Sequence, residues 1–312
     1  MQSMKYVRNE WMKLWSKKSS WIMLVLLLLV IIGYAGITKY FEVKDNLSET
    51  WEQEAQSQID MYKSWAAEEE TPDPYYSEQI QLLQYQLDHN MPGDFLISFS
   101  NMLSFGTDMI VLATIFAVIV AAGIVSSEFG TGTVKMLLTR PVSRWKILLS
   151  KLVTVILYGL TLFVVGVIVA GVVGLILFGT GSSVELQVVD GVVKELSPWR
   201  VILEGTLLSF GDFFMSIIFA FLIGSLFKSS TLSVGITLIC MLMGQTIVAL
   251  LSKYGFTKYI WLANTDLTQY MDGRTPLLEG TTLAFSIGVL AVYAVAFLVI
   301  TFVSFQKRDV TA

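Results

Sequence analysis

The residues of this chain that could do chemistry are few, and most lack the neighbours that catalysis or metal binding requires. The chain of 312 residues has one cysteine, Cys240, and one histidine, His89. A lone cysteine cannot form an intrachain disulfide, and a single histidine with no nucleophile elbow nearby does not suit a Ser-His-Asp triad. The sequence therefore predicts no catalytic residue, no metal site and no cofactor bound by this chain, which is not expected to be an enzyme.

A glycine-rich stretch, GTGTVK at residues 130–135, superficially resembles a phosphate-binding loop. A Walker A loop needs four residues between its glycines and then Gly-Lys-Ser/Thr, so that the backbone amides and the lysine converge on the phosphates. Here Gly130 and Gly132 are too close together, and Val134 precedes Lys135. If ATP drives this protein, another chain hydrolyses it.

Two polar residues, Asp212 and Gln245, fall inside long apolar runs. An unpaired charge is costly within a membrane, so Asp212 is expected to face the protein interior as a carboxylate of a translocation path or an interface. The alternative is a residue near a helix end that water reaches. Gln245 either holds helices together or touches cargo, because polar side chains do both between membrane helices.

The elements that must position these residues are membrane helices. Hydrophobic residues make up 54% of the chain and charged residues 15%, with a mean hydropathy of +0.65, whereas about a quarter of the residues in a soluble domain are charged. A helix needs roughly 20 apolar residues to cross a bilayer. We therefore predict an all-α integral membrane protein with about six transmembrane helices. The spans are expected near residues 20–38, 108–125, 147–178, 205–227, 231–251 and 281–305.

The basic residues set the predicted orientation, because Lys and Arg near the ends of spans stay in the cytoplasm. They precede the first span, lie between the second and third and between the fourth and fifth, and follow the last. With six spans, all of these positions fall on one side. Both termini are then expected in the cytoplasm, and residues 39–107, 179–205 and 252–280 outside.

Residues 1–19 have the pattern of an amphipathic helix. Its apolar face would carry Met4, Val7, Trp11, Leu14 and Trp15. Basic and polar residues occupy the opposite face, which suits a helix lying in the lipid headgroup layer. Such a helix either only anchors the chain or also contacts a cytoplasmic partner.

Residues 39–107 form a long acidic segment. Apolar residues recur in it at helix spacing on both sides of Pro72 and Pro74, which predicts a small extracellular helical hairpin. The hairpin could serve as a cap, a gate or a receptor for a cationic ligand. Its acidity could equally be that of an ordinary solvated face.

Residues 126–146 form a charged segment between the second and third predicted spans. Gly130 and Gly132 permit a sharp turn, residues 134–138 would form a short helix, and Pro141 would end it. Ser143 is placed to cap a helix that runs as one rod into the third span. A capped surface helix between two spans can transmit a push from a bound partner.

A resemblance to a known family is carried by residues 128–151, EFGTGTVKMLLTRPVSRWKILLSK. This stretch resembles the segment after the second span in membrane subunits of ATP-binding-cassette (ABC) transporters of the type-2 class, in which a Glu is followed by Gly-Thr, Leu-Leu, Pro-(Val/Ile)-Ser-Arg and a Lys. Residues 9–15, NEWMKLW, resemble that family's amphipathic elbow helix and include Trp11 and Trp15. The six-span plan extends the resemblance across the chain.

In that family the segment after the second span is a cytoplasmic coupling helix that docks into a separate ATPase subunit, and two permeases and two ATPases form the exporter. The resemblance therefore implies a permease subunit of a bacterial plasma membrane. Its implied partners are ATPase subunits that bind ATP and Mg, a second copy or a homologous permease, and membrane lipid, with no nucleic acid. The implied coupling residues are Glu128, Gly130, Thr131, Lys135, Leu137, Leu138, Arg140, Pro141 and Arg144.

The cargo and two other function classes stay open. Peptide antibiotics, drugs, lipid-like molecules and ions are all compatible with the resemblance. An ion-coupled secondary carrier would predict internal repeats and several charges within the spans, and the sequence shows neither. A membrane sensor could use the acidic hairpin as a ligand-binding site without any cargo route, whereas a membrane enzyme would need converging catalytic groups that the sequence does not show.

Overall fold

The computed structural model describes residues 2–45, 50–68, 74–92, 97–130, 143–181, 183–189, 191–227, 229–271, 274 and 276–307. In these ranges the chain is mostly helical, and six helical stretches are long and apolar enough to cross a membrane. The expectation of a helical protein with six candidate spans is confirmed. The spans are formed by α2 (Lys18–Asp45), α5 (Phe99–Asp108) together with α6 (Ile110–Gly130), α8 (Arg144–Phe178), α9 (Pro198–Leu226), α10 (Ser230–Leu251) and α11 (Leu283–Lys307).

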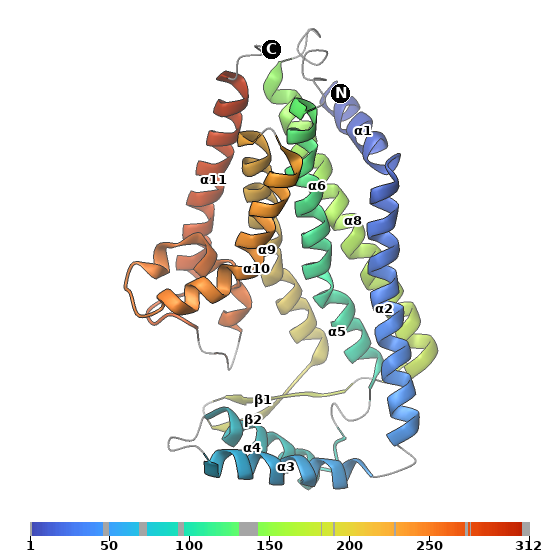
Figure 1. Ribbon diagram of the computed structural model, residues 1–312. Helices are drawn as coiled ribbons and strands as arrows, with labels where there is room; N and C mark the ends of the chain where they lie inside the picture. The colour runs from blue at the N-terminus through green and yellow to red at the C-terminus, as the bar shows by residue number, and fades with distance from the viewer. Residues whose placement is uncertain are drawn as a thin grey trace.

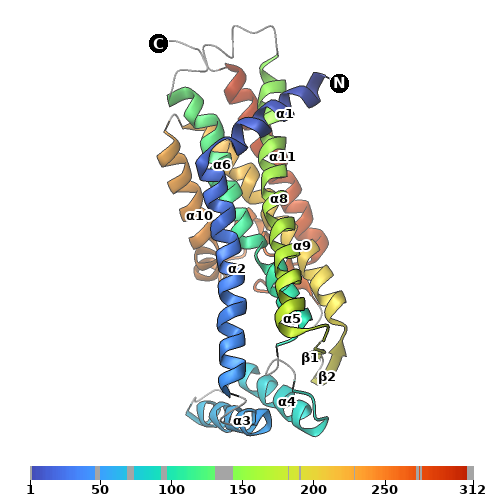
Figure 2. The ribbon, with the colours of Figure 1, turned by 90° about the vertical axis from the view of Figure 1, so that its right-hand side faces the viewer.

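The long helices form one upright bundle with two different ends (Figure 1). At one end lie α1 (Gln2–Trp15), the last turn of α6, the first turn of α8 and the last turn of α11. We call this the terminal end. At the other, the hairpin end, lie α3 (Trp51–Glu68), α4 (Pro74–Asp88) and a pair of short strands. Figure 2 shows α1 crossing α8 at the terminal end, where the two helices pack together.

The core of the bundle is the contact between α6 and α9. Small residues let these helices approach closely: a Cβ atom added at Gly224 of α9 would lie 2.5 Å from the carbonyl oxygen of Ala122 in α6. Close backbone approach at small residues is the usual way in which membrane helices associate. The helices α2, α10 and α11 instead bury few of their residues within the bundle, as helices that face lipid do.

The helical stretches that contain the second and fourth predicted spans begin at Phe99 and Pro198, ahead of the predicted span starts at residues 108 and 205. α5 begins at Phe99 behind the N-cap residue Ser98, and the chain turns at Met109 into α6. The polar residues near Asp108 interrupt the apolar run, so hydropathy alone marks only the part of this helical stretch that follows them. α9 begins at Pro198, in the first helical turn that proline favours.

Two structured segments occupy the hairpin end. α3 and α4 pack against each other through Ala55, Ile59 and Leu83, where the sequence predicts a helical hairpin. The strands β1 (Glu185–Val189) and β2 (Val192–Leu196) form an antiparallel pair that the sequence analysis does not predict. Two consecutive valines on each side of an Asp-Gly dipeptide were the available signal for it.

The segment between α10 and α11 folds back beside the bundle and contains three short 3-10 helices. They are η2 (Thr257–Tyr259), η3 (Trp261–Asn264) and η4 (Leu267–Tyr270). Asn264 fixes this segment, because its Nδ2 donates to the carbonyl oxygens of Lys258 and Ile260, each at 2.8 Å, and its Oδ1 accepts from Ser286 Oγ of α11 at 2.6 Å. The segment therefore forms a fixed wall next to α9 and α10.

Candidate functional site

A cleft of about 410 Å³ lies where α6, α9 and α10 meet the η3 and η4 segment. Asp212 of α9 and Gln245 of α10 both line it, so the structure brings together the two residues that sequence reasoning names for a translocation path. The role itself stays a prediction. The apolar part of the wall comes from Ile110, Val111, Ile115, Met241, Leu242, Trp261, Leu262 and Leu267.

Asp212 shares the cleft with a second carboxylate, Asp266. Ser216 Oγ, one helical turn further along α9, donates to Asp212 Oδ1 at 3.2 Å. Asp266 Oδ1 accepts from the backbone nitrogen of Thr268 at 3.0 Å and from its hydroxyl at 2.6 Å, and so caps η4. No Lys or Arg is among the described residues that line the cleft. The cleft therefore combines an apolar wall with negative charge.

Sequence reasoning missed Asp266, because residues 252–280 read as an outer loop. Its signal was the spacing of Asp266 and Thr268, in which the carboxylate accepts from the backbone two residues on and starts a turn. In the described part of the chain, no three His, Cys, Asp or Glu side chains gather as a metal site would require.

Gln245 links α10 to the folded-back segment. Its Nε2 donates to the carbonyl oxygen of Leu262 at 3.3 Å and lies 3.4 Å from Thr265 Oγ1, to which it also donates. Of the two roles that the sequence leaves open, the contacts favour holding helical segments together. Gln245 remains exposed at the cleft, so it can do this and still meet a ligand.

The elbow residues Trp11 and Trp15 pack at the terminal end of the bundle. The ring of Trp15 makes edge-to-face contacts with Trp11, with Trp21 of α2 and with Tyr158 of α8, at centroid distances of 5.7, 5.2 and 5.5 Å. Leu14 beside it is buried. α1 is thus fixed to two membrane helices through its aromatic face.

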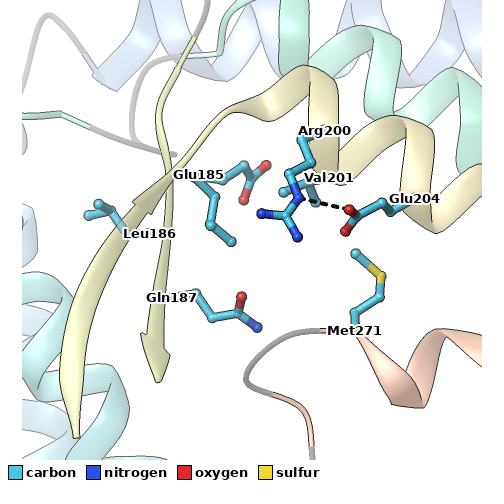
Figure 3. A pocket seen from close by; sticks show the side chains of 8 residues that line it. Glu185, Leu186, Gln187, Arg200, Val201, Glu204 and Met271 are labelled. Carbon is cyan, nitrogen blue, oxygen red and sulfur yellow. Dashed lines mark hydrogen bonds and ion pairs between the residues drawn. The ribbon is translucent and has the colours of Figure 1, made fainter. Parts of the chain in front are cut away.

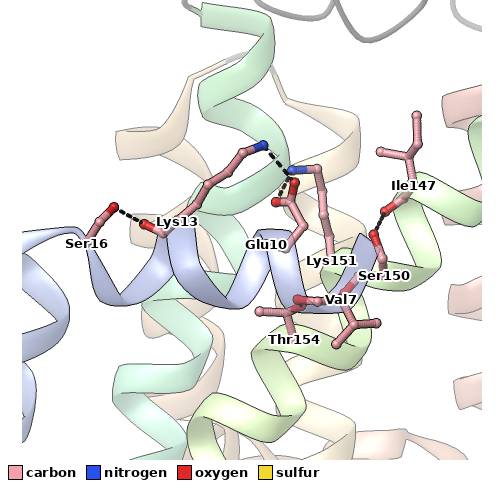
Figure 4. A network of polar contacts seen from close by, with 8 residues as sticks. All are labelled: Val7, Glu10, Lys13, Ser16, Ile147, Ser150, Lys151 and Thr154. Carbon is pink, nitrogen blue, oxygen red and sulfur yellow. Dashed lines mark hydrogen bonds and ion pairs between the residues drawn. The ribbon is translucent and has the colours of Figure 1, made fainter. Parts of the chain in front are cut away.

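A buried ion pair joins α1 to α8, and sequence reasoning missed it (Figure 4). Glu10 Oε2 lies 2.8 Å from Lys151 Nζ, and Glu10 Oε1 lies 2.9 Å from Lys13 Nζ. Lys151 is only 1% exposed. Burial alone would raise the pKa of Glu10, but its attraction to Lys151 and Lys13 outweighs burial and holds that pKa below its ordinary value of 4.5. The signal was a lone acid in an otherwise basic segment.

Most of the implied coupling residues, Thr131 to Pro141, lie outside the described residues, as does the short helix expected at 134–138. The backbone of Glu128 and Gly130 belongs to the last turn of α6. Arg144 begins α8, which runs unbroken for 35 residues as predicted. Its Nη1 donates to the carbonyl oxygen of Gln306 in α11 at 3.0 Å. The implied coupling segment is therefore preceded by α6 and followed by α8, and both helices run through the bundle.

A second, smaller cavity of about 80 Å³ lies near the hairpin end, between β1, the start of α9 and Met271 (Figure 3). Arg200 Nε of α9 donates to Glu204 Oε1, one helical turn further along, at 2.7 Å in the wall of this cavity. Both side chains are largely exposed, so this is an ordinary surface ion pair within one helix. The cavity is too small to rival the cleft as a site.

The comparisons with other proteins place the chain in a family. A sequence family described as "Protein of unknown function (DUF2705)" matches residues 75–311. The chain belongs to this family. The matched region includes every residue that lines the cleft and Lys151, whereas Glu10 and the rest of α1 precede it.

Two relatives come from Bacillus subtilis (strain 168). The chain is 36% identical over 309 residues to the "Uncharacterized protein YhcI", covering 97% of this chain and 98% of that protein. It is 35% identical over 219 residues to the "Uncharacterized membrane protein YdbK", covering 68% of this chain and 84% of that protein. Together with the six apolar helices, the second relative indicates that this family member is a multi-pass membrane protein.

Proposed function

We propose that this protein is the transmembrane permease subunit of an ATP-driven exporter of the ABC type-2 class, coupled to a separate ATPase subunit. The observation that carries the proposal is the course of α6. Its first residues, Ile110 and Val111, line the cleft, and its last residue, Gly130, lies at the terminal end, directly before the segment that resembles a coupling helix. One helix therefore joins the proposed docking site to the proposed cargo site.

The packing of α6 gives this link mechanical meaning. Gly224 of α9 meets the backbone of Ala122 so closely that an added Cβ would lie 2.5 Å from its carbonyl oxygen. Two closely packed helices move together as a rigid body, because their contact leaves no free space in which one could shift without the other. A displacement at Gly130 would thus move α9 together with α6, and Asp212 is carried on α9.

The helix on the other side of the segment supports the same proposal. α8 starts with Arg144, which bonds to the end of α11, and it carries Lys151, which is paired with Glu10 of α1. A push on the start of α8 would reach α1 and α11 at once. The elbow helix and the spans then respond as one unit to a docked partner.

In this proposal the chain forms the translocation path in a plasma membrane, and ATP and Mg are bound by the partner ATPase. A second copy of the chain or a homologous permease completes the path. The terminal end would face the cytoplasm, in keeping with the basic residues of α1 and of residues 135–146. The hairpin end would lie outside.

Copurification tests the proposal. The full chain, tagged at its C-terminus, is purified from its native membrane in mild detergent, and the proteins that accompany it are identified and assayed for ATPase activity. We expect a stoichiometric soluble subunit with a Walker A sequence. Arg140→Glu should release that subunit, because it reverses the charge that the docking segment presents to a docked partner.

The matched control is Arg200→Glu, the same charge reversal at the hairpin end, which should retain the ATPase. Arg144 is less suitable because its change would also break the bond to Gln306. A chain that purifies alone without ATPase activity would contradict the proposal and bring the ion-coupled carrier or the sensor to first place. Unchanged partner binding by Arg140→Glu would show that the segment is not the docking element.

A further inference from the structure

We propose that the cleft between α6, α9 and α10 binds a small organic cation with an apolar body, and that this class of molecule is the cargo. The export of that molecule depends on the proposed function, whereas its binding needs no ATPase. The cleft volume of about 410 Å³ lies within the range of roughly 300 to 1,000 Å³ that is usual for small-molecule sites.

The charge of the cleft specifies the sign of the ligand. Asp212 and Asp266 line it, and in the described part of the chain neither carboxylate forms a salt bridge. A carboxylate among apolar side chains is stabilised by an opposite charge close to it. A cationic ligand would supply that charge, whereas an anion would be repelled by both residues.

The nearby cation Arg274 does not cancel this charge. Its Nη1 donates to Thr268 Oγ1 at 3.2 Å, and Arg274 is not among the described residues that line the cleft. Two carboxylates in the lining, Asp212 and Asp266, outnumber this one cation beside it, so the cleft keeps a net negative charge.

The wall of the cleft specifies an organic rather than a bare cation. A bare Ca²⁺ ion takes six to eight oxygen ligands, whereas eight of the seventeen residues that line the cleft are apolar, among them Ile110, Val111 and Ile115 of α6 and Met241 and Leu242 of α10. Such side chains bury the apolar body of a ligand, and methionine adapts to its shape. The hydroxyl of Ser216 and the amide of Gln245 add directional contacts.

The test uses a pair of probes with the same shape and opposite charge, the tetraphenylphosphonium cation and the tetraphenylborate anion. The full-length chain is placed in nanodiscs of zwitterionic lipid, and binding is measured after subtraction of empty nanodiscs. We expect saturable binding of tetraphenylphosphonium that tetraphenylborate does not displace. Asp212→Asn should weaken it about tenfold or more, and Asp266→Asn severalfold, because each change removes one charge facing the ligand.

Matched variants separate charge from folding. Asp212→Glu keeps the charge and should retain most of the affinity, and Asp88→Asn, the same change at an exposed position of α4, should bind as the unaltered chain does. If Asp212→Asn does not fold, Asp266→Asn and Asp212→Glu still decide the matter. Equal binding of the two probes, or unchanged affinity in both Asp→Asn cleft variants, would overturn the cation site.

This outcome is independent of the proposed function. Copurification of an ATPase without binding of tetraphenylphosphonium would overturn the cargo class and leave the exporter standing. Binding of tetraphenylphosphonium by a chain that has no ATPase partner would support the cation site and contradict the exporter.

Discussion

Glu10 and Asp212 are both carboxylates held among apolar helices, but they differ in what lies next to them. Glu10 at the terminal end has Lys151 Nζ at 2.8 Å and Lys13 Nζ at 2.9 Å. Asp212 accepts one hydrogen bond from Ser216 at 3.2 Å, and within the described residues no lysine or arginine pairs with it. One charge is neutralised inside the protein, and the other faces a cleft.

The difference separates a structural contact from a candidate binding site. We call the structural contact, the ion pair of Glu10 and Lys151 between α1 and α8, the joint. A buried ion pair adds little net stability, because desolvation offsets the attraction, but removing one partner leaves a charge stranded. Glu10 and Lys151 therefore fix where α1 crosses α8. Asp212 lines a cleft and forms no ion pair with a described lysine or arginine, so it can instead pair with the positive charge of a ligand.

The largest effect we expect comes from removing half of the joint. Glu10→Leu should lower the free energy of unfolding by about 3 kcal/mol, because it removes the carboxylate that lies 2.8 Å from the almost fully buried Lys151. The double variant Glu10→Leu/Lys151→Leu should regain most of this loss, since it removes both buried charges of the pair. Unfolding of the full chain in detergent, followed by heat or denaturant, measures both.

Glu204→Leu is the control for this prediction. It breaks the ion pair between Glu204 and Arg200, whose side chains are 41% and 56% exposed, respectively. Exposed ion pairs contribute less than about 1 kcal/mol to stability. If Glu10→Leu were no more harmful than Glu204→Leu, the contact between α1 and α8 would be a surface contact and the contrast with Asp212 would disappear.

The joint also shows where sequence reasoning ends. The amphipathic helix at residues 1–19 and the long spans could be predicted, because periodicity and length are local properties. Lys151, the buried partner of Glu10, is 141 residues away, and nothing local in the sequence tells which distant basic residue Glu10 meets. The β1–β2 hairpin is different, since its Asp-Gly dipeptide was a local signal that hydropathy obscured.

A smaller effect of the opposite sign is expected in the cleft. Asp212→Leu should leave the free energy of unfolding unchanged or raise it by about 1 kcal/mol, because it removes a carboxylate that lacks a cation. The same change should abolish binding of tetraphenylphosphonium. Measured on one preparation, the free energy of unfolding would stay the same or rise while the binding of tetraphenylphosphonium is lost. A loss of stability equal to that of Glu10→Leu would make Asp212 a structural residue.

The candidate site was only partly predictable. Asp212 and Gln245 each stand out as polar residues in an apolar run, but their meeting in one cleft depends on the rotation and depth of α9 and α10, which the sequence does not specify. Asp266 lies in a segment that is held in place by the hydrogen bond between Asn264 and Ser286 of α11. That segment has no helix or strand periodicity from which its fold could be predicted. The coupling function of Thr131 to Pro141, outside the described residues, stays a prediction.

The smallest effect we expect is a pH dependence of the joint. The pKa of Glu10 in the folded protein lies below its ordinary value of 4.5, so the folded protein holds the ionised form more strongly than the unfolded chain does. The stability from this difference is complete above pH 4.5 and is lost as the pH falls through the lower, folded-state pKa. Unfolding temperatures of the unaltered chain and of Glu10→Leu/Lys151→Leu, measured side by side, should therefore keep a constant difference near neutral pH. Below pH 4.5 the unaltered chain should lose stability relative to the double variant, and parallel curves throughout would mean that Lys151 does not hold Glu10 ionised.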